Sequence, residues 1–315
     1  MEWMDILRGA AILLVVLYHA TGFPDWYHGI EIPSWLWLVD GFFLPFRMPT
    51  LLLLSGMLLG RALAKPAPEY FAGKLRTLVW PFLLWAGVEM LTYEYTGGQG
   101  ASLMNRDTWR EDTHLWFILY LAGYFLFAHV VRLIPAWLVA VALWVASLAL
   151  QGGWSEFLYF GGFFFAGHFV FQYFETVDRL MTRPLRAVLA IAACLFGAFA
   201  AVGDVDVYGR AEFVPLSLAG ILTAVWIAQM VPAGTAAWMR MIGRHSIVFY
   251  VLHFPLQLML MFVLTSAGVA LPGLVWVVVE VVVALAVGWV FAIGRSQPLV
   301  GLLFEWPRGP RTAVV

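Results

Sequence analysis

Long apolar runs with few charges leave this chain few folds to adopt. Of its 315 residues, 63% are hydrophobic and 12% are charged, and the mean hydropathy is +0.86. A water-soluble domain of this length cannot bury so much apolar surface, whereas a helical bundle in a bilayer exposes it to lipid. We therefore predict an all-α polytopic membrane protein with one domain over residues 1–315.

Ten runs approach or reach the roughly 17–25 residues that a helix needs to cross a hydrocarbon core of about 30 Å. Clusters of Pro and Gly mark the joints, as at 65–68 and 271–273, and the run at 135–150 is the shortest. The runs show no clear internal repeat. The predicted spans are Ile6–Gly22, Ser34–Leu59, Leu75–Tyr95, His114–Leu133, Pro135–Leu150, Phe157–Phe174, Arg186–Val202, Glu212–Val231, Arg244–Ser266 and Gly273–Ile293.

Basic residues predict the orientation of these spans. If the N-terminus is inside, fourteen of the eighteen Lys and Arg residues lie on the inner side, whereas Arg106, Arg110 and Arg210 lie outside and Arg47 lies within a span. This bias follows the positive-inside rule and predicts two cytoplasmic termini. We interpret the first run as a retained anchor, because no small-x-small cleavage site precedes Phe23.

Several functional classes are disfavoured by composition. The net charge is −1 and there is no basic run, so we expect no nucleic-acid partner. A single cysteine, Cys194, excludes an internal disulfide and a cysteine-based metal site. The histidines lack HExxH spacing, so we predict no metal. The sequence does not define an oligomeric state.

Arg8 and His19 are the most informative pair. Eleven helical steps place both side chains on one face, about 16–17 Å apart along the axis. A guanidinium near the inner boundary suits a phosphate or pyrophosphate, and an imidazole at mid-depth can take a proton from a hydroxyl or accept an acyl group. The alternative is that Arg8 is an ordinary anchor and His19 a packed histidine. Ionisable residues within spans usually mark a working site.

Other charged groups are predicted within the spans. Asp40 and Glu89 fall at roughly the depth of His19, and either one can orient its ring, unless both simply lie at the headgroup boundary. Arg47 either pairs with one of these acids or binds a substrate group. His253, near mid-membrane, is more often a packed than a catalytic histidine. Aromatic residues at 26–27 can stack on sugars, although interface anchoring is the commoner role.

Several motifs resemble those of the membrane acyltransferase-3 family. Residues 8–19 are similar to its first-helix signature, R-G-x-A-x-x-x-V-x-x-x-H, with ten residues between Arg and His. The resemblance extends in order along the chain. The other matching segments are 43–49 with Ser55-Gly56, 74–76 with Trp80-Pro81-Phe82, 114–117, and 242–246 with Tyr250-Val251-Leu252-His253.

This resemblance implies an O-acyltransferase of the bacterial inner membrane. The donor would be acetyl-CoA or another acyl-CoA, and the acceptor a hydroxyl of an extracytoplasmic carbohydrate or lipid-linked glycan. His19 and Arg8 match the essential residues of the family, and we add Asp40 as the third catalytic candidate. The candidate substrate-binding residues are Arg47, Lys74, Arg76, Glu89 and His253.

Two positions depart from the family pattern. Arg47 stands where relatives often have His, and the third-helix R-x-x-R is Lys74 and Thr77 here, with Arg76 between them. Donor contacts at that helix are therefore shifted or reduced. A transporter or flippase that moves a glycan or acyl lipid without forming a bond is the alternative function, because it would also use charges within the membrane.

Overall fold

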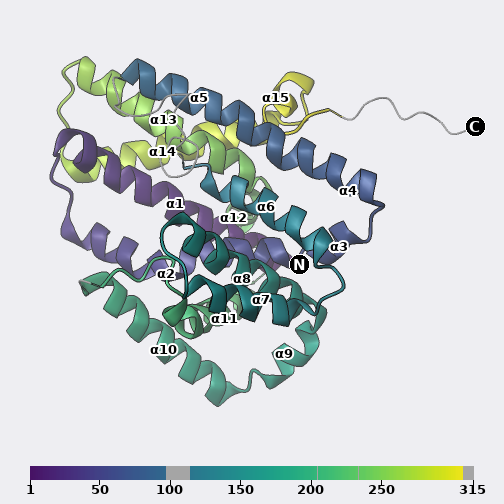
Figure 1. Cartoon of the computed structure of the whole chain (residues 1–315). Helices are drawn as coiled ribbons and strands as arrows, with labels where there is room; N and C mark the ends of the chain where they lie inside the picture. Colours follow the sequence, from purple (N-terminus) through teal and green to yellow (C-terminus); the bar gives the residue numbers. More distant parts are fainter. Residues whose placement is uncertain (97–113, 204, 233, 308–315) are drawn as a thin grey trace, which may run out of the picture.

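The computed structural model describes residues 1–96, 114–203, 205–232 and 234–307 (Figure 1). The described residues form helices and no strand, so the all-α prediction is confirmed. The elements are α1 (Glu2–His28), α2 (Ser34–Gly56), α3 (Leu59–Leu63), α4 (Ala67–Lys74), the π-helix η1 (Leu75–Val79), α5 (Trp80–Thr96), α6 (Trp116–Val130), α7 (Ala136–Ser147), α8 (Gly153–Gln172), α9 (Phe174–Leu180), α10 (Arg183–Val202), the 3₁₀ turn η2 (Ala211–Phe213), α11 (Val214–Met230), α12 (Ala237–Arg244), α13 (Ser246–Ser266), α14 (Gly273–Gly294) and α15 (Pro298–Leu302).

Each of the ten predicted runs contains a helix, but ten crossings are not confirmed. Among the described residues, six helical segments are long and apolar enough to cross a membrane, and α8 with α9 makes a seventh if the bent pair counts as one. Helices α6 and α7 have 15 and 12 residues, about 22 and 18 Å at 1.5 Å per residue, which is short of the 30 Å core. The cytoplasmic position of the termini stays a prediction.

The span predicted at 157–174 ends at a sharp bend. Helix α8 begins at Gly153 and ends at Gln172, and the chain then turns by 90° into α9. Helix α9 is short and carries charged residues, including Glu175, Asp178 and Arg179. Because of these charges, α9 is stable at the membrane interface but not within the hydrocarbon core.

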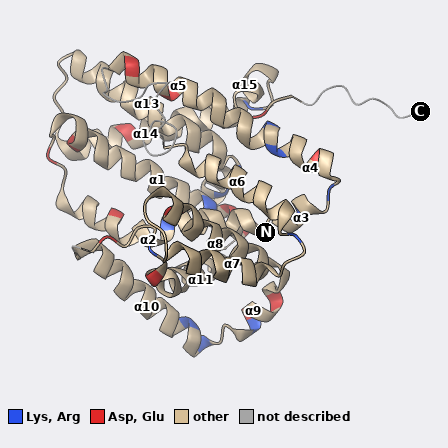
Figure 2. Ribbon diagram, viewed as in Figure 1, with Lys and Arg blue, Asp and Glu red and all other residues tan. Residues whose placement is uncertain are grey.

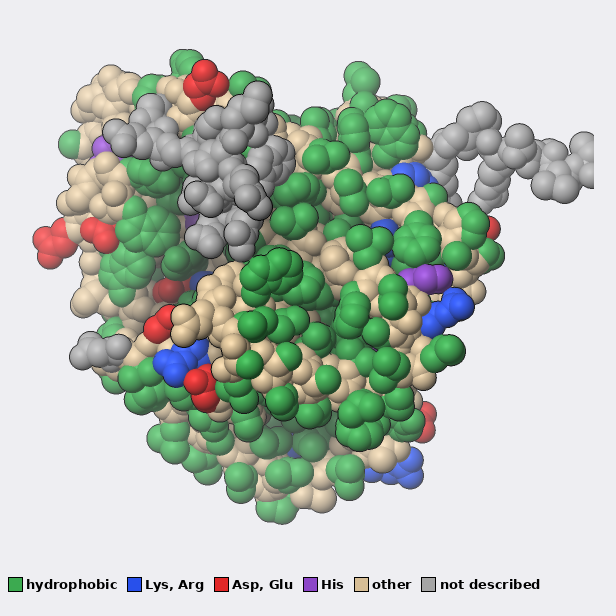
Figure 3. All heavy atoms as spheres, viewed as in Figure 1, with side chains coloured by type: hydrophobic (Ala, Val, Ile, Leu, Met, Phe, Trp, Pro, Cys, Tyr) green, Lys and Arg blue, Asp and Glu red, His purple; other side chains and the backbone are tan. Residues whose placement is uncertain are grey.

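Helices α1 and α2 form the middle of the bundle. In Figure 1 they lie between α13 and α14 on one side and α10 and α11 on the other, and they contact members of both groups. Charged residues are few along the helices (Figure 2), and hydrophobic side chains are spread across the face seen in Figure 3. This distribution suits a protein surrounded by lipid, with its buried polar groups held on central helices.

Small residues allow α2 and α8 to cross at close range. A Cβ atom on Gly56 would lie 1.7 Å from the carbonyl oxygen of Phe164, and one on Gly167 would lie 2.0 Å from that of Leu53. The two glycines therefore make a reciprocal backbone contact, as is common between membrane helices. Gly56 is therefore a small-residue contact between the two helices.

Gly56→Ala should lower the free energy of unfolding by roughly 1–3 kcal/mol, because the added methyl group forces the two backbones apart. Thermal unfolding in detergent micelles measures this effect. The matched control is Gly87→Ala in α5, where an added Cβ meets nothing within 4 Å and helix propensity favours Ala by up to about 1 kcal/mol. Equal unfolding temperatures for the two variants would contradict the close-contact role.

Candidate active site

One face of α1 lines two cavities that follow each other along the helix. Arg8 and Ile12 line a cavity of about 240 Å³, here the Arg8 cavity, and Val15 and His19 line one of about 480 Å³, here the His19 cavity. The spacing of these four residues is that of a single helical face. Helix α2 continues the same pattern with Leu51 and Ser55 at the Arg8 cavity and Leu44, Arg47 and Met48 at the His19 cavity. The face carrying Arg8 and His19 therefore faces interior space rather than lipid.

The His19 cavity combines three nitrogen-bearing side chains with an aromatic wall. His19, Arg47 and His114 line it, and they come from α1, α2 and the residues just before α6. Its volume is that of a small-molecule binding site. Nine of the residues that line it are aromatic: Tyr18, Phe23, Trp26, Tyr27, Tyr93, Trp116, Tyr208, Tyr250 and Phe254.

The hydrogen bonds of His19 and His253 define which ring nitrogens carry hydrogen. His253 Nδ1 lies 3.1 Å from the Phe249 carbonyl oxygen, and His19 Nδ1 lies 3.0 Å from that of Val15. A carbonyl oxygen only accepts, so in the neutral rings both Nδ1 atoms are donors. The single His19 Nδ1–H is then shared between the Val15 carbonyl oxygen and His253 Nε2, which lies 3.1 Å away. This assignment leaves a lone pair on His19 Nε2, the form a general base requires.

Glu89 binds His114 rather than His19. One Glu89 carboxylate oxygen lies 2.8 Å from His114 Nδ1, and the other accepts from the His114 backbone N–H at 3.3 Å. His114 Nε2 lies 3.0 Å from the Tyr250 carbonyl oxygen, and the Tyr250 hydroxyl donates to the His114 carbonyl oxygen. The carboxylate is fully buried and satisfied by this partner. The prediction that Glu89 orients His19 is therefore wrong.

Asp40 forms an ion pair with Arg47, and pairing with an acid is one of the two roles that the sequence predicts for Arg47. The Arg47 guanidinium donates to Asp40 Oδ1, lies 3.5 Å from the Leu14 carbonyl oxygen, and sits 4.5 Å from the ring centroid of Tyr18. Arg47 is 5% exposed and Asp40 11%. This carboxylate is held by a buried cation two turns further along the same helix, α2, and forms no hydrogen bond with His19. It therefore does not orient the His19 ring directly, and its catalytic role stays a prediction.

Two cations border the Arg8 cavity. Within the described residues Arg8 forms no ion pair, and its guanidinium has one long contact of 3.5 Å to the Leu54 carbonyl oxygen. The acids that precede it on α1 are engaged elsewhere, since Glu2 binds Arg240 at 2.5 Å and Asp5 binds Arg244 at 3.0 Å. The arrangement leaves Arg8 available to an anionic ligand.

Lys74, at the end of α4, also lines the Arg8 cavity, and its ammonium lies 3.3 Å from the ring centroid of Phe125. Burial, with a smaller effect from Lys65, lowers the pKa of Lys74 to about 8. Desolvation disfavours the charged form of an amine, so a bound anion would restore that form. Lys74 is therefore placed where the sequence predicted a donor contact.

Arg76 points away from both cavities. It lies in the π-helix η1, and its guanidinium binds Glu305 at 2.6 Å and the Trp306 carbonyl oxygen at 2.8 Å. The segment after α15 packs on the beginning of α5 (Figure 1), where fully buried Phe304 stacks on Trp85. This segment satisfies the Arg76 guanidinium, and Arg76 lines neither cavity, whereas its contact with a substrate stays a prediction.

His114 and Tyr250 were missed as site residues. Both occur in family-like segments, but spacing alone gave them no role, since neither shares a helix with Arg8 or His19. Their reciprocal hydrogen bonds join the start of α6 to α13. Tyr250 also lines both cavities, so the two spaces approach each other at its ring.

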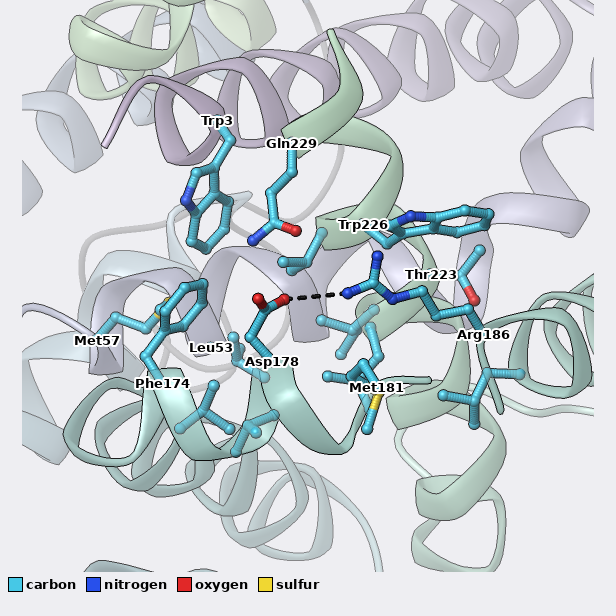
Figure 4. A pocket seen from close by; sticks show the side chains of 16 residues that line it. Trp3, Leu53, Met57, Phe174, Asp178, Met181, Arg186, Thr223, Trp226 and Gln229 are labelled. Atoms are coloured by element: carbon cyan, nitrogen blue, oxygen red, sulfur yellow. Dashed lines mark hydrogen bonds and ion pairs between the residues drawn. The ribbon is translucent and has the colours of Figure 1, made fainter. Parts of the chain in front are cut away.

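A separate apolar pocket lies among α1, α9, α10 and α11 (Figure 4). Asp178 and Arg186 point toward each other across it and form an ion pair of 3.2 Å. Its volume is about 40 Å³, and none of the predicted site residues lines it. It is not part of the candidate site.

Comparison with known proteins agrees with this geometry. Residues 1–293 match the family model of the acyltransferase-3 acyltransferase domain. The chain therefore belongs to the acyltransferase-3 family, and with its apolar helices it is a multi-pass membrane acyltransferase. Neither a curated protein nor a solved structure matches it significantly.

Asp40→Asn should destabilise the protein by about 3 kcal/mol, because it leaves the Arg47 cation buried without a counter-charge. Thermal unfolding in detergent micelles measures the loss, and adding Arg47→Gln should recover part of it. The control is Asp178→Asn, since Asp178 in the peripheral pair is 49% exposed and such pairs contribute less than about 1 kcal/mol. Equal, small losses of stability in Asp40→Asn and Asp178→Asn would contradict the stabilising role of the buried Asp40–Arg47 pair.

Proposed function

We propose that the protein transfers a short acyl group, in the first instance acetyl, from acyl-CoA to a hydroxyl of an extracytoplasmic carbohydrate or lipid-linked glycan. The observation that carries the proposal is the continuous face of α1, with Arg8, which has no ion pair in the described part of the chain, at one cavity and His19 at the next. The proposal places the chain in a bacterial cytoplasmic membrane, with the Arg8 cavity toward the cytoplasm.

The donor side of the proposal rests on charge. Arg8 and Lys74 border the same cavity and neither forms an ion pair within the described residues. A guanidinium binds phosphoryl oxygens through two parallel N–H groups, and an ammonium adds a point charge. The rest of the cavity wall is largely apolar, including Ile12, Leu121 and Phe125, which suits an extended pantetheine arm.

The acceptor side rests on the aromatic wall of the His19 cavity. Trp26 and Tyr27 are 48% and 43% exposed and stand at its edge, whereas Phe23 and Tyr250 are buried within it. Flat aromatic faces pack on the apolar faces of sugar rings, and their polar edges tolerate hydroxyl groups. Arg47 adds a cation to this wall, although Asp40 already compensates its charge.

His19 acts as general base in the proposed reaction. Its Nε2 takes the proton of the acceptor hydroxyl as that oxygen attacks the thioester carbonyl carbon. The carbon–sulfur bond then breaks, and the imidazolium returns the proton to the departing thiolate, so no net proton is gained or lost. The bond from His19 Nδ1 to His253 keeps the lone pair on Nε2 throughout the approach.

His19→Ala should abolish acyl transfer while the protein still inserts, with a loss on the order of 10²–10⁴-fold for removal of a general base. The assay supplies radiolabelled acetyl-CoA to inside-out membrane vesicles and follows label into the glycan and lipid-glycan fraction. The control is His28→Ala, an exposed histidine at the end of the same helix.

Retained activity in His19→Ala would overturn the mechanism. Label that appears on the unmodified protein and is absent from His19→Ala would indicate an acyl-histidine intermediate in place of general-base catalysis. Movement of a glycan lipid across the membrane with no transfer of label by the unmodified protein would favour the transporter alternative.

Donor affinity should fall as pH rises through about 8, because Lys74, with a pKa of about 8, then loses its charge. Each pH unit above the pKa lowers the charged fraction about tenfold, so KM for acyl-CoA should rise by up to about tenfold from pH 7 to 9. Lys74→Met should raise KM at pH 7 and flatten the profile, whereas Lys74→Arg should keep the low KM at pH 9. An unchanged profile in Lys74→Met would contradict the assignment.

A further inference from the structure

We propose that Tyr250 is the partition between the two cavities and that it selects short acyl groups over long ones. The size selection rests on the proposed function, because it concerns the acyl group that passes from the Arg8 cavity to the His19 cavity. The partition itself rests only on the packing around Tyr250.

The position of Tyr250 carries the proposal. It lines both cavities and is 3% exposed. Its ring centroid lies 5.4 Å from that of Phe117, which lines the Arg8 cavity. It also lies 5.3 Å from the ring centroid of His114, which lines the His19 cavity. Residues of α1 and α2 line both cavities. The side chains that separate the two cavities therefore come from α13, which carries Tyr250, and from α6, which carries Phe117.

Hydrogen bonds hold the Tyr250 ring in place. Its hydroxyl donates to the His114 carbonyl oxygen, and its own carbonyl oxygen accepts from His114 Nε2. Glu89 anchors His114 in turn through two contacts, at 2.8 and 3.3 Å. Moving the ring therefore requires breaking one hydroxyl bond, while the backbone bond can remain. The Tyr250 side chain is therefore held in one position by a single hydrogen bond from its hydroxyl group.

The proposed position of the Tyr250 ring between the two cavities predicts which donors the enzyme accepts. An aromatic ring packed on both sides leaves a narrow passage, so a two-carbon acyl group meets less obstruction than a six-carbon chain. Interior packing is dense, and each added methylene that does not fit is costly. Truncating the ring should remove this obstruction without changing Arg8, Lys74 or His19.

The first test compares acetyl-CoA and hexanoyl-CoA as donors at equal concentrations. We expect the unmodified protein to prefer acetyl, and Tyr250→Ala to reduce the ratio of kcat/KM values by about tenfold or more, the scale on which pockets discriminate methylene groups. Tyr250→Phe keeps the ring and should stay close to the unmodified ratio while lowering its thermal stability.

The matched controls are Tyr124→Phe and Tyr124→Ala. Tyr124 is equally buried and its hydroxyl donates to the Phe157 carbonyl oxygen at 2.6 Å, but it lines neither cavity. An acetyl-to-hexanoyl ratio that is unchanged in Tyr250→Ala, or changed equally in Tyr124→Ala, would overturn the size selection.

A second test does not require acyl transfer. Cys194→Ser gives a protein without cysteine, and Ser55→Cys then places one thiol in the wall of the Arg8 cavity. A charged, membrane-impermeant methanethiosulfonate is applied to sealed spheroplasts from the face that carries Trp26. We expect slow modification while Tyr250 is present and faster modification in Tyr250→Ala.

A Met48→Cys variant in the same background is the accessibility control, because position 48 lines the His19 cavity and should react in both proteins. Equal reaction rates at position 55 with and without the Tyr250 ring would overturn the partition. If no donor supports transfer in any variant, the proposed function fails, whereas the thiol rates still decide the role of Tyr250.

Discussion

The rigid repeat of α1 is the constraint on which the site depends. Residues 8, 12, 15 and 19 share one face because the α-helix turns every 3.6 residues, and backbone hydrogen bonds fix the distance between Arg8 and His19. No loop contributes to this spacing. The remaining helices provide walls around the face, and ion pairs from Glu2 and Asp5 to α12 hold its first turns in place.

Pairing of buried charges explains why His19 has no carboxylate partner among the residues that the structure describes. A carboxylate in an apolar interior needs a cation or several donors, and Arg47 and His114 meet that need for Asp40 and Glu89. His19 is instead oriented by a neutral ring, that of His253. A neutral acceptor fixes the tautomer without adding negative charge beside the base. The cavity can therefore hold its charged groups in compensated pairs while one imidazole nitrogen faces the substrate.

The sequence predicted what depends on a single helix and failed where helices meet. Helical periodicity and apolar run length were sufficient for the all-α fold, the ten helical runs and the shared face of Arg8 and His19. The bend after Gln172 and the short α6 and α7 were not predictable, because run length does not reveal where tertiary contacts end a helix. The partners of Glu89 and Arg76 were missed for a related reason, whereas the pair of Asp40 with Arg47, on one helix, was among the predicted arrangements. Depth within a membrane is readable from position in a span, but rotation about the helix axis and distant partners such as Glu305 are not.

A partition at Tyr250 gives the proposed reaction a physical basis for choosing sugar over water. The His19 cavity has an exposed aromatic edge, and water would be a competing nucleophile for any thioester placed there. A ring packed between Phe117 and His114 keeps the two spaces apart until a donor occupies the passage. The thioester then reaches His19 only when its own arm fills the gap, and an acceptor stacked on the aromatic wall excludes water from the same place. Separation of the cavities thus supports transfer across the membrane and protects the donor from hydrolysis.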